Sequence, residues 1–260
     1  MAQSLNYASE GDGGVVVFLH GMAASRHYWQ PVLDLKPAGR LITIDLLGFG
    51  ESPKPHDVTY DYETHIAAIM DTLEVAGVHG KFTLVAHSMG ALLALRLAAT
   101  NPDRVTKLVL FGLPYYPDIR TARDDITQSK LLWRLAYYGP TSKVLCTTWC
   151  KWLRPVTRFI APLYLPRLPH RVAQDSLKHS WQSYSQSLRY VIEEQRVADD
   201  LDKISVPISL LYGAYDKPGT FLKDSRLLED RQNIEMTIYP GLTHQLPLEK
   251  PQLIVDQLER

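Results

Sequence analysis

The sequence predicts an α/β fold with a mostly parallel central sheet of about seven strands, helices on both faces and a helical cap inserted in the core. Short runs rich in Val, Ile and Leu recur along the 260-residue chain. Segments with the 3.6-residue apolar period of amphipathic helices separate these runs. The alternation stops once, between residues 115 and 200. Alternating strands and helices favour a parallel sheet that is covered on both sides.

Six runs have the length and composition of strands buried on both faces. They are Val15–Leu19, Leu41–Ile44, Phe82–Val85, Lys107–Phe111, Ile208–Tyr212 and Ile234–Tyr239. Between the second and third runs, Ile66, Ile69 and Leu73 recur at helical spacing, and a Leu/Ala-rich run begins at Ala91. The segment Pro251–Leu258 is also amphipathic. In such sheets the chemistry gathers in loops at the carboxyl ends of the strands.

Residues 115–200 contain no run typical of a buried strand. Helical, aromatic and proline-punctuated segments take over there, with four of the five tryptophans: Trp133, Trp149, Trp152 and Trp181. The flanking segments have the pattern of neighbouring strands of one sheet. We therefore interpret residues 115–200 as a cap inserted into a core formed by residues 1–114 and 201–260.

Composition limits the classes of partner. Lys+Arg and Asp+Glu balance at 28 each, so the charge does not favour a nucleic-acid partner. No basic segment followed by an apolar stretch opens the sequence, and no apolar run approaches the ~18 residues of a membrane helix. We expect a small-molecule substrate, no stable membrane insertion and a cytoplasmic location. The oligomeric state is left open.

The chain has two cysteines, Cys146 and Cys150. They stand four residues apart in a segment with a helical pattern, where both would lie on one face. Two cysteines are not a disulfide framework, and no further thiol or imidazole stands at the usual zinc-ligand spacing. The sequence therefore favours two packed thiols over a metal site.

A serine stands where one of the predicted strands meets a helix. Ser88 lies in Ala86-His87-Ser88-Met89-Gly90, with small residues two positions to either side. A tight strand-to-helix turn strains the backbone of its central residue and needs small neighbours. A serine hydroxyl becomes a nucleophile only when an imidazole accepts its proton and a carboxylate orients that imidazole.

This stretch resembles the nucleophile elbow of the α/β-hydrolase fold family, with Ala86 where glycine is most common. The family order is nucleophile, acid, histidine. Asp216 follows the apolar run that ends at Tyr212, and His244 follows the last run. The resemblance thus implies a catalytic triad of Ser88, Asp216 and His244. Asp118, which follows the preceding strand, is an alternative acid.

Two further stretches match the family. His20-Gly21-Met22 follows the first apolar run and resembles the start of the oxyanion loop, which implies the backbone N–H groups of Met22 and Met89 as the oxyanion hole. We interpret His20 as a buried organiser of this loop. The stretch from Asp45 to Ser52 resembles the family's Asp-x-x-Gly-x-Gly-x-Ser loop, whose Asp and Ser would satisfy local backbone donors.

A serine at position 88 argues against the family's dehalogenase and epoxide-hydrolase branches, in which a carboxylate is the nucleophile. The sequence favours a carboxylesterase-type serine hydrolase for small to medium, mostly apolar substrates, with no cofactor and no metal required. Two alternatives stay open. One is hydrolysis of carbon–carbon bonds in diketone-type ring-cleavage products, although Met22-Ala23-Ala24-Ser25 lacks the usual glycine-rich run. The other is a ligand receptor that retains the fold.

Overall fold

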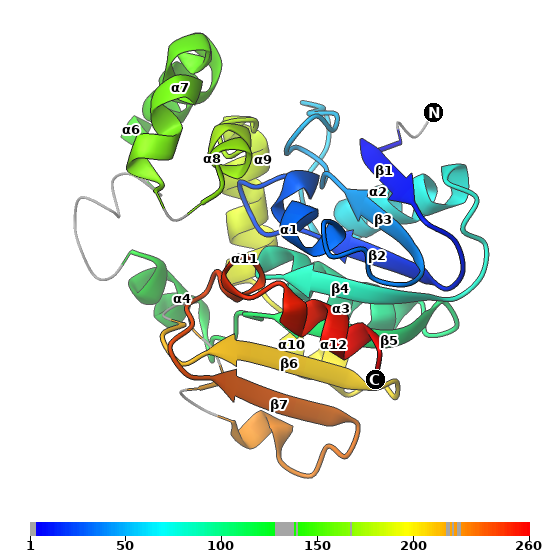
Figure 1. The fold of residues 1–260 in the computed structure, drawn as a ribbon. Coiled ribbons are helices and arrows are strands. Elements are labelled where there is room, and N and C mark those ends of the chain that lie inside the picture. The colour runs from blue at the N-terminus through cyan, green and yellow to red at the C-terminus, as the bar shows by residue number, and fades with distance from the viewer. Residues whose placement is uncertain are drawn as a thin grey trace.

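The computed structural model describes residues 4–127, 138, 140–166, 168–216, 219, 221–222 and 225–260. Its centre is a seven-stranded sheet of order β1-β3-β2-β4-β5-β6-β7 (Figure 1). The strands are β1 (Tyr7–Glu10), β2 (Val15–Leu19), β3 (Arg40–Ile44), β4 (Phe82–His87), β5 (Val105–Phe111), β6 (Ile208–Gly213) and β7 (Ile234–Tyr239). All neighbouring pairs are parallel except β1 and β3. The predicted fold class is confirmed.

The six apolar runs all form strands, but two details differ from the sequence prediction. Strand β1 is not predicted by the sequence, because its four residues, Tyr7–Glu10, contain no apolar run. An antiparallel strand at the edge of a sheet can form without one, since a single neighbour supplies its hydrogen bonds. At the other edge, no residue of β7 is fully buried, although the sequence predicts burial on both faces.

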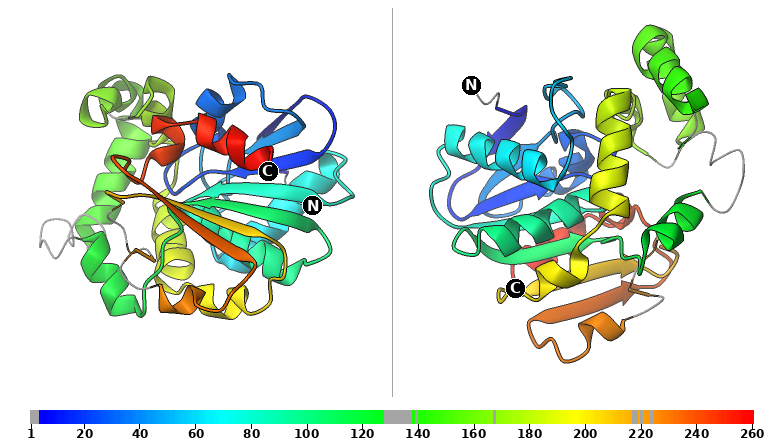
Figure 2. Two further views of the ribbon diagram at one scale, coloured as in Figure 1. Left: turned by 60° about the horizontal axis from the view of Figure 1, so that its bottom comes forward. Right: turned by 180° about the vertical axis from the view of Figure 1, so that it is seen from behind.

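Helices cover both faces of the sheet (Figures 1 and 2). Helices α2 (Tyr62–Val75), α3 (Met89–Thr100) and α10 (Val197–Leu201) lie on one face, and α1 (Gln30–Leu33) and α12 (Gln252–Leu258) lie on the other. Alternate residues of β2 separate the two sides. Val17 and Leu19 belong to the core cluster that contains α2 and α3 residues, whereas Val16 and Phe18 pack with Trp29 and Ile254. This alternation follows from the two-residue period of a strand.

Between β5 and β6 the described residues form helices, turns and loops, with no strand. The elements are α4 (Ile119–Ile126), α6 (Pro140–Thr147), η2 (Thr148–Trp152), α7 (Arg154–Tyr164), α8 (His170–Asp175), α9 (Trp181–Ser187), η3 (Leu188–Glu193) and α10. Helices α4, α6, α7 and α8 lie on the side to which the parallel strands point, and α6 and α7 stand furthest from the sheet (Figures 1 and 2). The predicted boundaries of the cap, 115 and 200, stay a prediction. Trp133 lies outside the described residues.

The last part of this region packs against the core. Leu188, Val191 and Leu201 are buried in the same cluster as α3 and the strands. Arg96 of α3 forms an ion pair with Asp200 of α10, with 3.1 Å between Nε and Oδ1. None of the helices that the structure describes is both long enough and apolar enough to cross a bilayer.

Candidate active site

Ser88 stands at a sharp turn between β4 and α3. Its φ and ψ are 53° and −120°, a conformation that side-chain-bearing residues rarely adopt. Gly90 makes the turn possible, since a Cβ there would lie 2.5 Å from the carbonyl oxygens of both Leu19 and His20. The elbow is therefore pressed against the end of β2. The first small residue, Ala86, is fully buried within the sheet.

Asp216 and His244 meet at the ends of neighbouring strands. Asp216 follows β6, His244 follows β7, and Nδ1 of the imidazole lies 2.9 Å from Oδ1 of the carboxylate. The aspartate side chain is buried, whereas that of His244 is 19% exposed. A buried carboxylate in this position fixes the ring and selects the tautomer that carries its proton on Nδ1, which leaves the Nε2 lone pair free to accept a proton.

The alternative carboxylate has another role. Asp118 is an exposed residue that caps α4, and its two oxygens accept hydrogen bonds from the backbone N–H and the hydroxyl of Thr121 at 2.8 and 2.9 Å. These hydrogen bonds hold the pKa of Asp118 below its ordinary value. The carboxylate that contacts His244 is therefore Asp216 and not Asp118.

Gly112, directly after β5, is a site residue that the sequence reading missed. Its φ is +55°, and a Cβ there would lie 2.8 Å from Nδ1 of His244 and 3.1 Å from Oδ2 of Asp216. The backbone of Gly112 thus packs directly against the carboxylate–imidazole pair, with no room for a side chain between them. The sequence does place a glycine directly after a predicted strand, but it does not indicate which side chains pack against that glycine.

We expect Gly112→Ala to lower the kcat/KM of a reaction that uses His244 by roughly 10²-fold, because a displacement of about 1 Å in a catalytic group costs this much. Gly77→Ala is the matched control, since Gly77 also has a positive φ of 72° but has open space around its Cβ position. The positive φ alone should cost each variant about 1–2 kcal/mol of unfolding free energy in urea, and Gly112→Ala should lose more than Gly77→Ala because its Cβ also displaces His244. Equal activities in the two variants would contradict the steric role of Gly112.

His87 connects the elbow to the histidine loop. Its Nε2–H donates to the backbone carbonyl of His244 at 2.8 Å, and its ring stacks on Tyr28 with centroids 4.7 Å apart. Burial and the neighbouring His244 lower the pKa of His87 well below its ordinary value. A neutral imidazole is thereby kept beside the catalytic candidates. Tyr28 in turn donates to Gln245 at 3.1 Å, which ties the same loop to η1 (Arg26–Trp29).

The predicted oxyanion loop passes directly against the serine. A Cβ on Gly21 would lie 3.2 Å from Cβ of Ser88. His20 holds this loop: its Nδ1–H donates to the carbonyl of Gly21 at 2.7 Å, and its Nε2 accepts from the N–H of Leu46 at 2.9 Å. The prediction that His20 is a buried organiser is confirmed. Met22 lines the cavity beside Ser88, and Met89 is the first residue of α3, where the backbone N–H has no acceptor within the helix.

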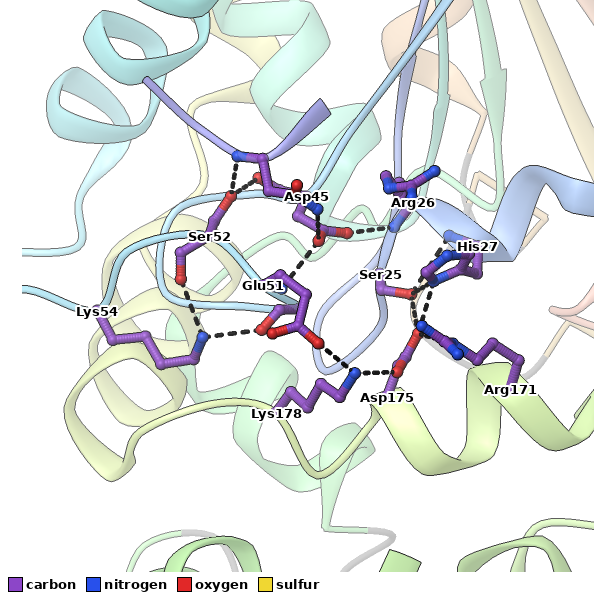
Figure 3. A network of polar contacts seen from close by, with 12 residues as sticks. Ser25, Arg26, His27, Asp45, Glu51, Ser52, Lys54, Arg171, Asp175 and Lys178 are labelled. Carbon is purple, nitrogen blue, oxygen red and sulfur yellow. Dashed lines mark hydrogen bonds and ion pairs between the residues drawn. The ribbon is translucent and has the colours of Figure 1, made fainter. Parts of the chain in front are cut away.

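The loop from Asp45 to Ser52 is hydrogen-bonded to the segment that directly follows the predicted oxyanion loop. The Asp45 carboxylate accepts from the N–H groups of Arg26 and Glu51 at 2.6 and 2.8 Å, and the Ser52 hydroxyl donates to the Asp45 carbonyl. Gly50 leaves room for this carboxylate, since a Cβ there would come within 2.4 Å of it. The predicted structural role of Asp45 is confirmed (Figure 3), whereas the backbone N–H that donates to the Ser52 hydroxyl is that of the distant Asn6, at 2.9 Å.

Asp175 of α8 joins the helical region to these loops (Figure 3). Its buried carboxylate accepts from the Ser25 hydroxyl at 2.7 Å and contacts Nδ1 of His27 at 2.8 Å. Lys178 lies between Asp175 and Glu51 and forms ion pairs with both. Burial alone would raise the pKa of Asp175, but the hydrogen bonds from His27, Lys178 and Ser25 outweigh it and hold the pKa below its ordinary value.

We expect Asp175→Asn to lower the unfolding free energy by about 2 kcal/mol at pH 7, the usual size of hydrogen bonds to a charged group. Because the folded-state pKa is depressed, this stabilisation is present above the unfolded-state pKa of about 4 and is lost as the pH falls through the folded value. Urea unfolding of both proteins measures the effect: the difference in unfolding free energy between wild type and Asp175→Asn should be smaller at pH 3 than at pH 7. Asp103→Asn, at an exposed position, should change stability little at either pH. Equal stability of wild type and Asp175→Asn at pH 7 would contradict the role of the carboxylate.

Ser88 and His244 open into one cavity of about 900 Å³. Its volume lies within the roughly 300–1,000 Å³ of sites for small molecules. Apolar and aromatic side chains form much of its wall, from the core loops, α4, α8 and η3: Met22, Ala24, Tyr28, Tyr116, Ile126, Leu168, Val172 and Ile192. Asp124 and Asp125 of α4 also line it. The wall of the cavity thus combines an apolar surface with the carboxyl groups of α4.

The fold, the arrangement of the site and the similarity to known sequences together identify the family of this protein. Residues 14–225 match the model of the alpha/beta hydrolase fold, so the chain belongs to the α/β-hydrolase fold family. It is 32% identical over 258 residues to "Probable lysophospholipase BODYGUARD 4" of Arabidopsis thaliana, covering 93% of this chain and 62% of that protein. The chain thus spans less than two thirds of this relative's length.

Two other proteins resemble this chain, one over part of its sequence and the other in its overall structure. A haloalkane dehalogenase of Bradyrhizobium diazoefficiens is 40% identical over 111 residues, which cover 42% of this chain and 35% of that protein. Among solved structures, E-2-(acetamidomethylene)succinate hydrolase superposes with a TM-score of 0.75 at 18% identity, covering 98% of this chain and 93% of the other. At this identity the superposition supports the fold alone.

Proposed function

We propose that this protein is a serine hydrolase that cleaves carboxylic esters of small to medium, mostly apolar substrates through an acyl-enzyme intermediate. One observation carries the proposal. His244, which contacts the buried Asp216, and the strained Ser88 elbow are far apart in the sequence but line the same cavity at the carboxyl ends of the strands. This is the combination of nucleophile, base and orienting carboxylate that acyl transfer needs.

In the proposed reaction, Ser88 Oγ attacks the ester carbonyl while His244 Nε2 takes the hydroxyl proton. His244 then gives this proton to the leaving alcohol, and the acyl group stays on Ser88. A water molecule, deprotonated by His244, releases the acid and restores the serine. Asp216 holds the ring and stabilises the imidazolium in both halves of the reaction, which is why its burial against Nδ1 matters.

The tetrahedral intermediates carry a negative charge on the former carbonyl oxygen. We propose that the backbone N–H groups of Met22 and Met89 donate to this oxygen. Met89 begins α3, where an N–H is free and the helix dipole favours negative charge. His20 and Asp45 hold the loop that contains Met22 through hydrogen bonds already formed in the resting structure. The donors are thus fixed before the charge develops, which is the condition for strong stabilisation of the transition state.

Ester cleavage fits better than the reaction of the dehalogenase relative. A serine at position 88 forms an acyl ester that water can open at the carbonyl carbon, whereas halide displacement in this family uses a carboxylate nucleophile. The name of the Arabidopsis relative points to ester substrates with an acyl chain, and the apolar cavity wall supports such a chain. The cytoplasmic location and the absence of a nucleic-acid partner stay predictions from the sequence.

A series of p-nitrophenyl esters of increasing acyl length, assayed with wild type and Ser88→Ala, tests the proposal. We expect Ser88-dependent release of p-nitrophenol with an optimum chain length set by the cavity. Turnover of a vinylogous diketone with poor ester activity would instead favour the carbon–carbon hydrolase. Tight ligand binding with negligible turnover of either substrate would favour a receptor.

A further inference from the structure

Three metal-ligating side chains converge in the helical region, away from Ser88. They are Cys146 of α6, Cys150 of η2 and His179, which lies between α8 and α9. Nε2 of His179 lies 3.5 Å from Sγ of Cys146 and 3.7 Å from Sγ of Cys150. All three ligand atoms lie within 4.8 Å of one another. The sequence interpretation of two packed thiols did not include the histidine, because it stands 29 residues beyond the second cysteine.

The orientation of His179 leaves a lone pair at the point of convergence. Its Nδ1 lies 2.9 Å from the carbonyl oxygen of Ser176, and a carbonyl can only accept, so the ring proton is on Nδ1. Nε2 then has a single lone pair, which one S–H group would satisfy. Two sulfur atoms nevertheless approach it. The hydrogen bond from Nδ1 to a backbone carbonyl is also the usual way in which proteins orient a histidine that binds a metal.

The two sulfur–nitrogen distances match those of a tetrahedral zinc site. With Zn–S near 2.3 Å and Zn–N near 2.0–2.1 Å, tetrahedral angles separate a sulfur from a nitrogen ligand by about 3.5–3.6 Å. The two observed sulfur–nitrogen distances lie at or close to this value. Thiolate and imidazole ligands select zinc over magnesium or calcium, which prefer oxygen.

We propose that Cys146, Cys150 and His179 bind one Zn²⁺ ion as a Cys₂His site whose fourth position faces a second cavity. This cavity has a volume of about 640 Å³, and none of its lining residues belongs to the Ser88 cavity. Its described lining residues include four cationic side chains and no carboxylate; the cationic ones are Lys54, Lys143, Lys151 and Arg154. Two thiolates neutralise the charge of Zn²⁺, so these cations favour water or a small anion as the fourth ligand.

Binding is balanced by the release of protons. Each thiol loses its proton to solvent as its sulfur bonds to the metal, so one Zn²⁺ replaces two protons, and His179 keeps the proton on Nδ1. The metal would join α6 and η2 to the segment before α9, which is separated from Cys146 by 33 residues. The site would therefore connect two parts of the helical region that share no covalent cross-link.

The chain's two cysteines make the test unambiguous, since a thiol assay counts only these two groups. The full-length protein is treated with a chelator, reduced and then titrated anaerobically with Co²⁺. We expect one equivalent to produce thiolate-to-cobalt charge-transfer absorption, and one equivalent of Zn²⁺ to abolish it. Bound Zn²⁺ should also protect both thiols from a colorimetric thiol reagent. Unchanged reactivity of both thiols with excess Zn²⁺ would overturn the proposal.

Variants locate the ligands. Cys150→Ser and His179→Gln should each weaken Co²⁺ binding at least 100-fold, whereas His56→Gln should not, although His56 lines the same cavity. Circular dichroism identifies any variant that fails to fold. If a variant does not fold, protection of the wild-type thiols by Zn²⁺ serves as the test of the site instead. Charge-transfer absorption that persists in the double variant Cys146→Ser/Cys150→Ser would also refute the site. So would a Cys146–Cys150 disulfide that persists under reducing conditions and prevents the metal from binding.

Discussion

Ser88→Ala is expected to lower kcat for p-nitrophenyl esters by at least about 10⁴-fold, because no other group in the proposed mechanism can form the acyl intermediate. His244→Ala should lose about as much, since a hydroxyl without its base is almost unreactive at neutral pH. Initial rates under saturating substrate measure both effects. The unfolding free energy of Ser88→Ala should equal or exceed that of wild type, because alanine removes the polar group but keeps the same backbone.

The double variant provides the stricter test. Residues that act as one unit have non-additive effects, so Ser88→Ala/His244→Ala should be no slower than either single variant. Additive losses would mean that the two side chains act in separate steps. Ester turnover retained in Ser88→Ala would show that this serine is not the nucleophile.

Asp216→Asn is expected to lower kcat by about 10⁴-fold, the size of effect seen when the orienting carboxylate of a serine–histidine pair becomes an amide. The amide can present its NH₂ to Nδ1, which favours the wrong tautomer and leaves the imidazolium without a counter-charge. The close contact between Asp216 and His244, with the carboxylate buried, makes this effect large. Stopped assays with high enzyme concentration measure the residual rate.

Asp118→Asn is the matched control, since Asp118 was the other candidate acid. Asparagine caps helices nearly as well as aspartate, so α4 should keep its N-terminus and the stability should change by less than about 1 kcal/mol. Its kcat should stay within about twofold of wild type. A greater loss of activity in Asp118→Asn than in Asp216→Asn would reverse the assignment of the acid.

Much of the fold can be read from local sequence patterns. A central strand such as β4 must be apolar on both faces because helices cover both, and its run is therefore visible without any tertiary information. The edge strand β1 (Tyr7–Glu10) is only partly buried and its sequence YASE has no such run, so only its pairing with β3 identifies it. The Ser88 elbow was visible because a strained turn needs small neighbours at fixed positions.

The sequence by itself determined the α/β class, the positions of six apolar strands along the chain and the serine elbow, because each depends on residues that are adjacent or regularly spaced. Only the tertiary structure decided which carboxylate contacts His244, that Gly112 lies beneath this pair and that Asp175 joins α8 to the loops around it. It also brought His179 to the two cysteines. Such contacts join residues tens to hundreds of positions apart, and chain folding, not local pattern, sets those distances.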